Sequence, residues 1–153
     1  MGFIGGRKGI SSTDVKLSAF ESTIKQLGIP YHPEWIIPSS FGVEDGYSSM
    51  VQLLSQRNRP TAVMTVNDFT AIGAINAATD YGLRVPQDMS VTGFDGTYLT
   101  DIMRPTVTTI SQNYAELGKQ AVEAIAQVSL GKRFPRNTRI PTQLIIKNSC
   151  QKV

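Results

Sequence analysis

The chain has 153 residues, a length typical of one compact domain, and 41% of them are hydrophobic while 18% are charged. This composition excludes a disordered, collagen-like or coiled-coil protein, and no apolar run approaches the roughly 20 residues of a membrane span. One cysteine, Cys150, and one histidine, His32, exclude a disulfide framework and a cysteine-cluster zinc site. We expect a soluble protein without metal, cofactor or membrane contact.

The net charge is +3, and the bases gather toward the C-terminus. After Glu123 no acidic residue follows, and the bases there are Lys132, Arg133, Arg136, Arg139, Lys147 and Lys152. They flank a predicted helix end and strand instead of alternating with aromatic residues, which favours a solvated face over a nucleic-acid surface.

The first predicted element is a short apolar strand at residues 2–5. Ser11, Ser12 and Thr13 offer N-cap oxygens to a helix that Gly28 ends. The face that this helix turns inward carries Leu17, Phe20, Ile24 and Leu27. A second brief strand is expected at residues 35–38.

Two helices are predicted in the middle of the chain, at residues 44–56 and 68–81, separated by a strand at 61–66. The first of them has a helical stripe that predicts burial of Tyr47, Met50, Val51 and Leu54. The second is rich in alanine, turns Ile72 and Ile75 inward, and ends at Gly82.

Strands at residues 89–94 and 107–110 precede a last helix at 113–130, which Gly131 ends, and a closing strand at 143–146. The stripe expected to be buried on the last helix consists of Leu117, Ala121, Ile125 and Val128. Short apolar strands, each followed by an amphipathic helix, predict a doubly wound α/β fold, a parallel sheet covered on both faces. A core strand that begins at residue 2 also indicates further sequence upstream.

Polar and aromatic residues follow the predicted strands. In doubly wound sheets ligands bind beyond the carboxyl ends of the strands. The candidate binding residues there are Ser12, Lys16, Phe41, Asn67, Asp68, Asp95, Gln112 and Tyr114. Such a set of donors, acceptors and aromatic rings suits a small polyhydroxylated or heterocyclic ligand.

Each candidate also has a structural interpretation. Asn67 or Asp68 stands where a helix needs an N-cap, and Asp95 before Gly96 could set a turn. Phe41 and Tyr114 could be core residues, and Lys16 a solvated lysine. The functional interpretation depends on the convergence of all these strand ends.

Catalytic patterns are absent from the sequence. It has no G-x-S-x-G elbow, and His32 in its loop cannot serve a triad. In "GGRKGIS" Lys8 precedes Gly9 instead of following a glycine, so a Walker-type phosphate loop fails. We therefore expect no enzyme.

Two stretches, "RPTAVMTVNDFTAIGAINAATDYGLRVPQDMSVTGFDG" and "RPTVTTISQNYAELGKQAVEAI", closely resemble the effector-binding core of the lactose/galactose-repressor (LacI/GalR) family of bacterial transcription regulators. The resemblance covers the whole chain and is most specific in the N-D pair, the G-L-R-V-P-x-D-x-S-V-x-G-F-D block and the R-P-x-V-T-T-I-x-Q segment. It implies a periplasmic-binding-protein-like type I fold and a cytoplasmic allosteric sensor. Its two subdomains close around a sugar or nucleobase-like effector and change the operator affinity of an N-terminal DNA-binding domain that this chain lacks.

By this resemblance residues 1–111 supply most of the C-terminal subdomain, 112–140 cross into the N-terminal subdomain, and 141–153 form the return strand and tail. The family dimerises through the C-terminal subdomain, so the helix at 44–56 and the segment around Met103 are the candidates for a homodimer interface.

The resemblance also assigns roles. Asp95 matches the family's effector-binding aspartate, and Asn67 with Asp68 matches its N-D pair. Phe41 stands where the family places an aromatic ring against the ligand, Gln112 and Tyr114 stand where the crossover strand reaches the cleft, and Ser12 adds a hydroxyl. Lys16 replaces a common effector-contacting arginine, and without the bidentate fork a carboxylate-bearing effector is less favoured.

Two other functions stay open from the sequence. A periplasmic sugar-binding protein of an uptake system shares the N-D and G-F-D-G motifs, although V-P-x-D and R-P-x-V-T-T-I resemble the repressor branch. A stand-alone interaction module would form oligomers without responding to a small molecule.

Overall fold

The computed structural model describes residues 1–7 and 9–152; Lys8, named above for the failed phosphate loop, lies outside them. The elements in chain order are β1 (Gly2–Gly5), α1 (Ser11–Gln26), the 3-10 helix η1 (Pro33–Trp35), β2 (Ile36–Pro38), α2 (Val43–Leu54), β3 (Ala62–Thr65), α3 (Asp68–Asp80), β4 (Ser90–Asp95), α4 (Leu99–Ile102), β5 (Thr108–Ser111), α5 (Tyr114–Ser129) and β6 (Gln143–Ile145). Each predicted strand and helix is present, with ends that differ by one or two residues. The short elements η1 and α4 were not expected.

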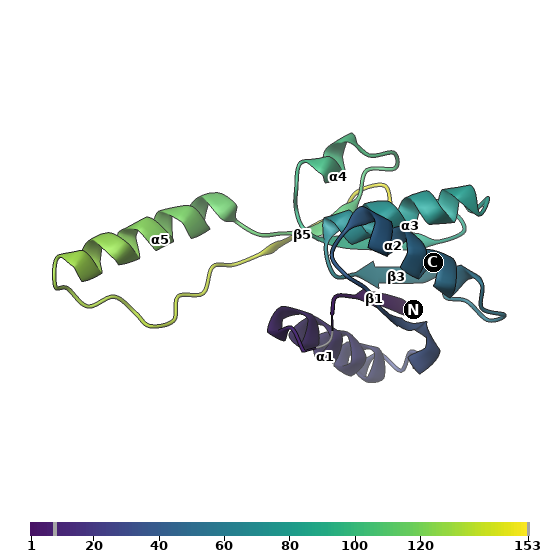
Figure 1. Ribbon diagram of the computed structural model, residues 1–153, viewed down its shortest axis with the longest axis horizontal. Coiled ribbons are helices and arrows are strands. Elements are labelled where there is room, and N and C mark those ends of the chain that lie inside the picture. The colour runs from purple at the N-terminus through teal and green to yellow at the C-terminus, as the bar shows by residue number, and fades with distance from the viewer. Residues whose placement is uncertain (8, 153) are drawn as a thin grey trace.

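One sheet, in the strand order β2-β1-β3-β4-β5-β6, forms the centre of the described molecule (Figure 1). The strands from β2 to β5 pair in parallel, with Phe3 opposite Ile36 and Met64, and Thr92 opposite Thr108. The last strand differs from the parallel arrangement, because β6 pairs antiparallel with β5. A return strand that follows a long excursion enters the edge of the sheet from the opposite end.

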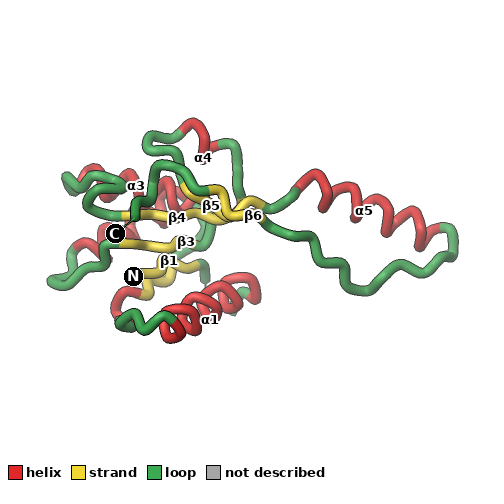
Figure 2. The backbone as a smooth tube through the Cα atoms, turned by 180° about the vertical axis from the view of Figure 1, so that it is seen from behind, coloured by secondary structure: helices red, strands yellow, loops and turns green. Residues whose placement is uncertain are grey.

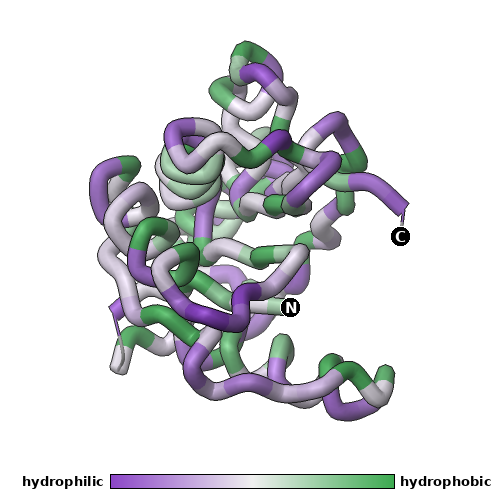
Figure 3. Tube along the Cα trace, turned by 90° about the vertical axis from the view of Figure 1, so that its right-hand side faces the viewer, coloured by the Kyte–Doolittle hydropathy of each residue, from purple (hydrophilic) through white to green (hydrophobic). Residues whose placement is uncertain are grey.

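Helices cover both faces of the sheet, which confirms the doubly wound, three-layer α/β/α class (Figure 1). On one face α2 and α3 bury the larger core with side chains such as Met50, Leu53 and Ile75 against Ile4 and Val91. On the other face α1 packs through Phe20 and Ile24 onto Phe3. The trace coloured by hydropathy shows apolar and polar stretches alternating along the chain, as elements with one buried face require (Figure 3).

Helix α2 is rotated relative to the sequence prediction. Met50 and Leu54 are buried as expected, but Tyr47 is 36% exposed, Val51 is only partly buried, and Leu53, which the predicted stripe omitted, is fully buried. Tyr47 instead donates its hydroxyl to Asp80 at the end of α3. The buried face is shifted by one position, so that Gly46 faces α3, where a Cβ would meet the Thr70 backbone.

The predicted N-cap of α1 is wrong, whereas the glycines predicted to end the helices are right. The N-cap of α1 is Ile10, and no side chain caps the helix, so Ser11, Ser12 and Thr13 belong to its first turn. Leu27 is 67% exposed because it lies beyond the end of the helix. The glycines predicted to end helices do adopt the left-handed conformation, with φ of 65° at Gly28, 79° at Gly82 and 70° at Gly131.

Helix α5 and the loop that returns from it to β6 extend away from the sheet (Figures 1 and 2). The expected burial of Leu117, Ala121, Ile125 and Val128 is wrong: no residue of α5 is buried, and Ile125 is 68% exposed. The stripe exists in the sequence, but no described element lies against it.

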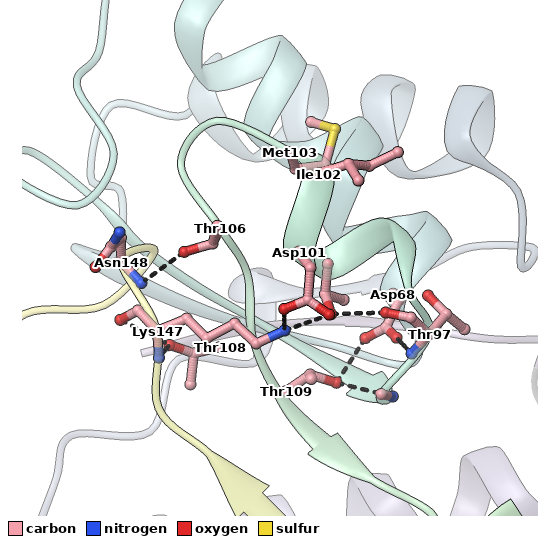
Figure 4. Close-up of polar contacts among 12 residues, drawn as sticks. Asp68, Thr97, Asp101, Ile102, Met103, Thr106, Thr108, Thr109, Lys147 and Asn148 are labelled. Atoms are coloured by element: carbon pink, nitrogen blue, oxygen red, sulfur yellow. Dashed lines mark hydrogen bonds and ion pairs between the residues drawn. The ribbon is translucent and has the colours of Figure 1, made fainter.

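Lys147 departs from the solvated basic face that the sequence suggested. Its side chain is only 13% exposed, and Nζ lies 2.6 Å from Oδ1 of Asp101 and donates to the Thr100 hydroxyl at 2.7 Å (Figure 4). Lys147 therefore ties the segment after β6 to α4.

Candidate functional site

The candidate site lies at the carboxyl edge of the sheet, where the order of the strands reverses. The chain passes from β1 outward to β2 and then back past β1 to β3, so the loops after β1 and β3 leave the sheet in different directions. Such a switch point opens a crevice in doubly wound folds. Residues that follow β1, β3, β4 and β5 meet at this crevice.

Asp95 is the acidic group at the end of β4. Its Oδ1 accepts a hydrogen bond from the side-chain amide of Gln112 at 2.7 Å, and its backbone carbonyl accepts from the Gln112 N–H at 3.1 Å. The side chain is half-buried, and this burial raises the pKa of Asp95 from its ordinary value, an effect that the Gln112 bond and the Lys16 charge oppose. Asp95 thus keeps one carboxylate oxygen without a described partner.

Lys16 comes from α1 on the opposite wall. Its Nζ donates to the backbone carbonyl of Val66 at 2.9 Å and lies 3.6 Å from the centre of the Phe94 ring. A cation over a ring face is attracted by the ring quadrupole. Burial lowers the pKa of Lys16, while the charges of Asp95 and Asp68 raise it. Lys16 is therefore not the solvated lysine of the structural interpretation.

Asn67 is the N-cap of α3, which is one of the structural interpretations that the sequence left open. Its Oδ1 accepts from the Thr70 N–H at 2.8 Å and caps α3, and its Nδ2 donates to the Phe41 carbonyl at 3.0 Å. Asn67 is 9% exposed, whereas Phe41 is 37% exposed and is not a core residue. A side chain at Gly6 would lie 2.6 Å from the Phe41 ring, so the glycine leaves the space that this ring occupies.

Asp68 is fully buried, and both of its carboxylate oxygens are bonded within the chain. Oδ2 accepts from the Thr97 N–H at 2.7 Å, and Oδ1 accepts from the Thr109 hydroxyl at 2.6 Å (Figure 4). The structure therefore places Asp68 beneath the crevice and not on its surface.

Tyr114 and Ser12 lie at the rim. Tyr114 begins α5 and is 50% exposed, so it is not a core residue, and partial burial together with the charges of Asp95 and Asp68 raises its pKa. Ser12 is exposed in the first turn of α1, and it lines the same groove as Lys16 and Gln112. The structure thus gathers Asp95, Lys16, Gln112 and Tyr114, while Asn67 lies beside Phe41.

A mostly apolar groove of about 890 Å³ opens beside these residues, between α1 and the sheet. Its walls are built by Val15, Phe20, Ile24, Leu27, Met64 and Phe94, and Lys16, Ser12 and Gln112 stand at its polar end. An apolar wall with a few convergent polar groups has the make-up of a small-molecule site.

Sequence reasoning missed three contributors. In the sequence Phe94 stands out only as part of the G-F-D motif, whereas in the structure the Lys16 cation lies over its ring. Thr97 and Thr109 bond to Asp68, which is 29 and 41 residues away in the sequence, so no local pattern marks these bonds. Of these three residues only Thr109 could have been found from the sequence. It belongs to the threonine pair in R-P-x-V-T-T-I, and a polar side chain in a buried strand requires a hydrogen-bond partner.

Two negative observations apply to the residues that the structure describes. None of the helices in this part of the chain combines the length and apolar character that a bilayer crossing requires. Within residues 1–7 and 9–152 no group of three or more histidine, cysteine or acidic side chains is arranged to hold a metal ion.

The relatives of the chain are transcriptional repressors. It is 35% identical over 157 aligned residues to the HTH-type transcriptional repressor PurR of Haemophilus influenzae (strain PittEE). This alignment covers 100% of the chain and 47% of PurR. The chain is 39% identical over 127 residues to the ribose operon repressor of Haemophilus influenzae (strain ATCC 51907 / DSM 11121 / KW20 / Rd), which covers 83% of this chain and 38% of that protein. The chain thus spans about half or less of the length of these curated relatives.

A solved structure agrees with these relatives. The lac repressor dimer bound to operator and the anti-inducer ONPF superposes with a TM-score of 0.90 at 28% identity, over 99% of this chain and 52% of that one. The resemblance to lactose/galactose-type repressors is therefore confirmed. The family model described as "periplasmic binding protein-like domain" matches residues 1–150, and the chain belongs to this family.

Proposed function

We propose that the chain is the effector-sensing and dimerisation core of a bacterial transcriptional regulator. It binds a small polyhydroxylated molecule, a sugar, at the carboxyl edge of the sheet and controls operator binding by a DNA-binding domain outside these 153 residues. The observation that carries this proposal is the half-buried Asp95, held by Gln112 at 2.7 Å and facing the crevice in a chain whose relatives are repressors.

Each residue at the edge has a role in sugar binding. The second Asp95 oxygen accepts a ring hydroxyl, a bond to a charged group that is worth about 1.5–3 kcal/mol. The exposed Phe41 ring packs on the apolar face of the sugar, while Lys16, Ser12 and Tyr114 supply donors at the rim. Lys16 carries an ammonium group and not the guanidinium fork of an arginine. It therefore binds the hydroxyl groups of a ligand better than it binds a ligand carboxylate.

The exposed α5 supports the domain division. Residues 1–111 form the C-terminal subdomain, 112–140 contribute to a second subdomain, and 141–153 return to the sheet. The uncovered stripe of Ile125 and its neighbours then packs within the second subdomain, and the effector closes the two subdomains over Asp95.

The surface around α4 and Met103 supports a homodimer, and we place this regulator in the cytoplasm. Tyr98 is 73% exposed and Ile102 61% exposed beside Met103, and an apolar cluster of this kind marks an interface. The solved lac repressor to which the chain is similar is a dimer. The repressor relatives give no support to the alternative of a periplasmic uptake protein.

Isothermal titration calorimetry with D-ribose tests the sugar proposal, because one relative is a ribose operon repressor. We expect ribose to bind and the Asp95→Ala variant to bind it at least tenfold more weakly, consistent with the loss of one charged hydrogen bond. Asp80→Ala is the matched control, since Asp80 is exposed at the far end of α3 and should leave the affinity unchanged.

Two results would contradict the proposal. Equal ribose affinity of the wild type and Asp95→Ala would remove Asp95 from the site. Binding of adenine in place of ribose, with the same loss in Asp95→Ala, would keep the sensor but change its effector class to nucleobases.

A further inference from the structure

The buried carboxylate of Asp68 has a function that contact with an effector does not explain. It is 0% exposed, and no donor other than Thr97 and Thr109 is described for it. A buried carboxylate is costly unless hydrogen bonds compensate for lost hydration. An apolar residue would fill the same space at lower cost, so the two bonds themselves require an explanation.

One partner of Asp68 lies in the turn Asp95–Gly96–Thr97, and the other lies on the neighbouring strand. Thr97 lies two residues beyond Asp95, and Thr109 lies on β5 opposite Gly93. The Thr109 hydroxyl donates to Asp68 and also accepts from the Gly96 N–H at 3.2 Å. Asp68 therefore fixes Thr97 directly, by the bond drawn in Figure 4, and Gly96 through Thr109.

The turn needs such a restraint, because its backbone is unfavourable. Asp95 has a φ of 115°, a region that side chains rarely adopt, and Gly96 follows with a φ of 73°. A side chain at Gly96 would lie 2.6 Å from the Ser111 Cα, so the turn also packs closely on β5. Conformations of this kind persist only where surrounding bonds determine them.

We infer that Asp68 is a positioning residue: it holds the Asp95–Gly96–Thr97 turn so that the Asp95 carboxylate meets Gln112 and faces the crevice. A carboxylate suits this task because it presents two acceptors to two donors. The consequence for effector affinity rests on the function proposed above, whereas the positioning of the turn does not.

Helix α4, which follows the turn, provides a control. There Asp101, with a side chain that is 68% exposed, pairs with Lys147. Asp101→Asn makes the same chemical change as Asp68→Asn, but it does so on the surface, at a carboxylate whose described bond goes to Lys147 and not to the turn.

Nuclear magnetic resonance of the full 153-residue chain tests the inference without a ligand. The readouts are hydrogen exchange of the Thr97 amide and the chemical shift of the Gln112 side-chain amide, which reports its bond to Asp95. In Asp68→Asn we expect Thr97 exchange to accelerate at least tenfold and the Gln112 resonances to move to their positions in Asp95→Ala. Asp101→Asn should match the wild type in both.

Thr109 variants keep the test decisive if Asp68→Asn does not fold. Thr109→Val removes the hydroxyl at nearly constant shape and should change both readouts in the same direction, whereas Thr109→Ser retains the hydroxyl and should restore them. Unchanged Thr97 exchange and Gln112 shifts in Asp68→Asn, or in Thr109→Val where Asp68→Asn fails to fold, would overturn the inference. So would a Thr109→Ser variant that behaves like Thr109→Val.

Titration with D-ribose separates the two proposals. If the wild type binds ribose, Asp68→Asn should lose at least tenfold in affinity and Asp101→Asn should lose none; an unchanged Asp68→Asn would refute the link between the turn and the effector. If the wild type does not bind ribose, the sugar proposal fails, while the exchange and shift data still decide whether Asp68 positions the turn.

Discussion

The contact between α2 and α3 offers a sharp test of the packing that supports the site. Gly73 is buried in α3, and a Cβ at this position would overlap the backbone carbonyl oxygen of Val43 and lie 2.6 Å from the Tyr47 nitrogen. Both atoms belong to the backbone of α2 and cannot rotate away. Gly73→Ala therefore forces the two helices apart.

The magnitude follows from two opposing effects. Alanine is better than glycine in a helix interior by about 1 kcal/mol. Overpacking of a rigid core costs typically about 1–3 kcal/mol and occasionally more, and here the whole of α2 must shift, so we place the cost at the upper end. The net result is a loss of about 2 kcal/mol in the free energy of unfolding.

Urea denaturation followed by circular dichroism measures this loss. With a slope of about 2 kcal/mol per molar urea, the midpoint of Gly73→Ala should fall by about 1 M. Gly118→Ala is the control, because Gly118 lies in the exposed α5 and a Cβ there meets nothing within 4 Å; its midpoint should not fall. A Gly73→Ala midpoint at or above that of the wild type would refute the close helix contact.

Two further predictions concern single polar groups. Burial raises the pKa of Asp95 in the folded state above its ordinary value of 3.8, so its ionisation opposes folding: its contribution to stability is present at acid pH and is lost as the pH rises through the raised pKa. Asp95→Asn, which keeps an acceptor for Gln112, should therefore stabilise the chain at pH 7 but not at pH 3 in urea titrations; a gain that is equal at both pH values would contradict this. Ser149→Ala should cost about 1–3 kcal/mol in the same assay, because the buried Ser149 hydroxyl accepts from the Thr108 N–H at 2.8 Å and its loss leaves that donor unpaired. The exposed Ser22→Ala should change stability by less than about 0.5 kcal/mol, and an equal effect of the two variants would refute the role of Ser149.

The order and type of the elements could be predicted because their signals are local. Apolar runs such as GFIG and TAVMTV lie in the strands, and Gly28 and Gly82 end helices because glycine adopts positive φ without a steric penalty. The α5 stripe shows the limit of such signals. Its periodicity predicted a helix correctly, but periodicity does not supply a neighbouring surface, and Ile125 lies exposed.

Some features of the candidate site could likewise be predicted from local sequence, and others could not. Its position at the carboxyl ends of the strands follows from the fold class, so the sequence alone named Asp95, Lys16 and Gln112. The bonds of Asn67 to Thr70 and Phe41 were only half predictable, since the cap is local and the contact with the loop is not.

Local patterns of residues are enough to predict the α/β class, the strand ends at which a ligand could bind and the repressor-like motifs that run through the chain. The tertiary structure alone decided that Asp68 lies beneath the turn and not in the crevice, because its partners Thr97 and Thr109 are brought to it by the pairing of β4 with β5. It also decided that β6 runs antiparallel and that Lys147 pairs with Asp101. Contacts between residues far apart in sequence depend on the completed sheet, and local patterns carry no information about them.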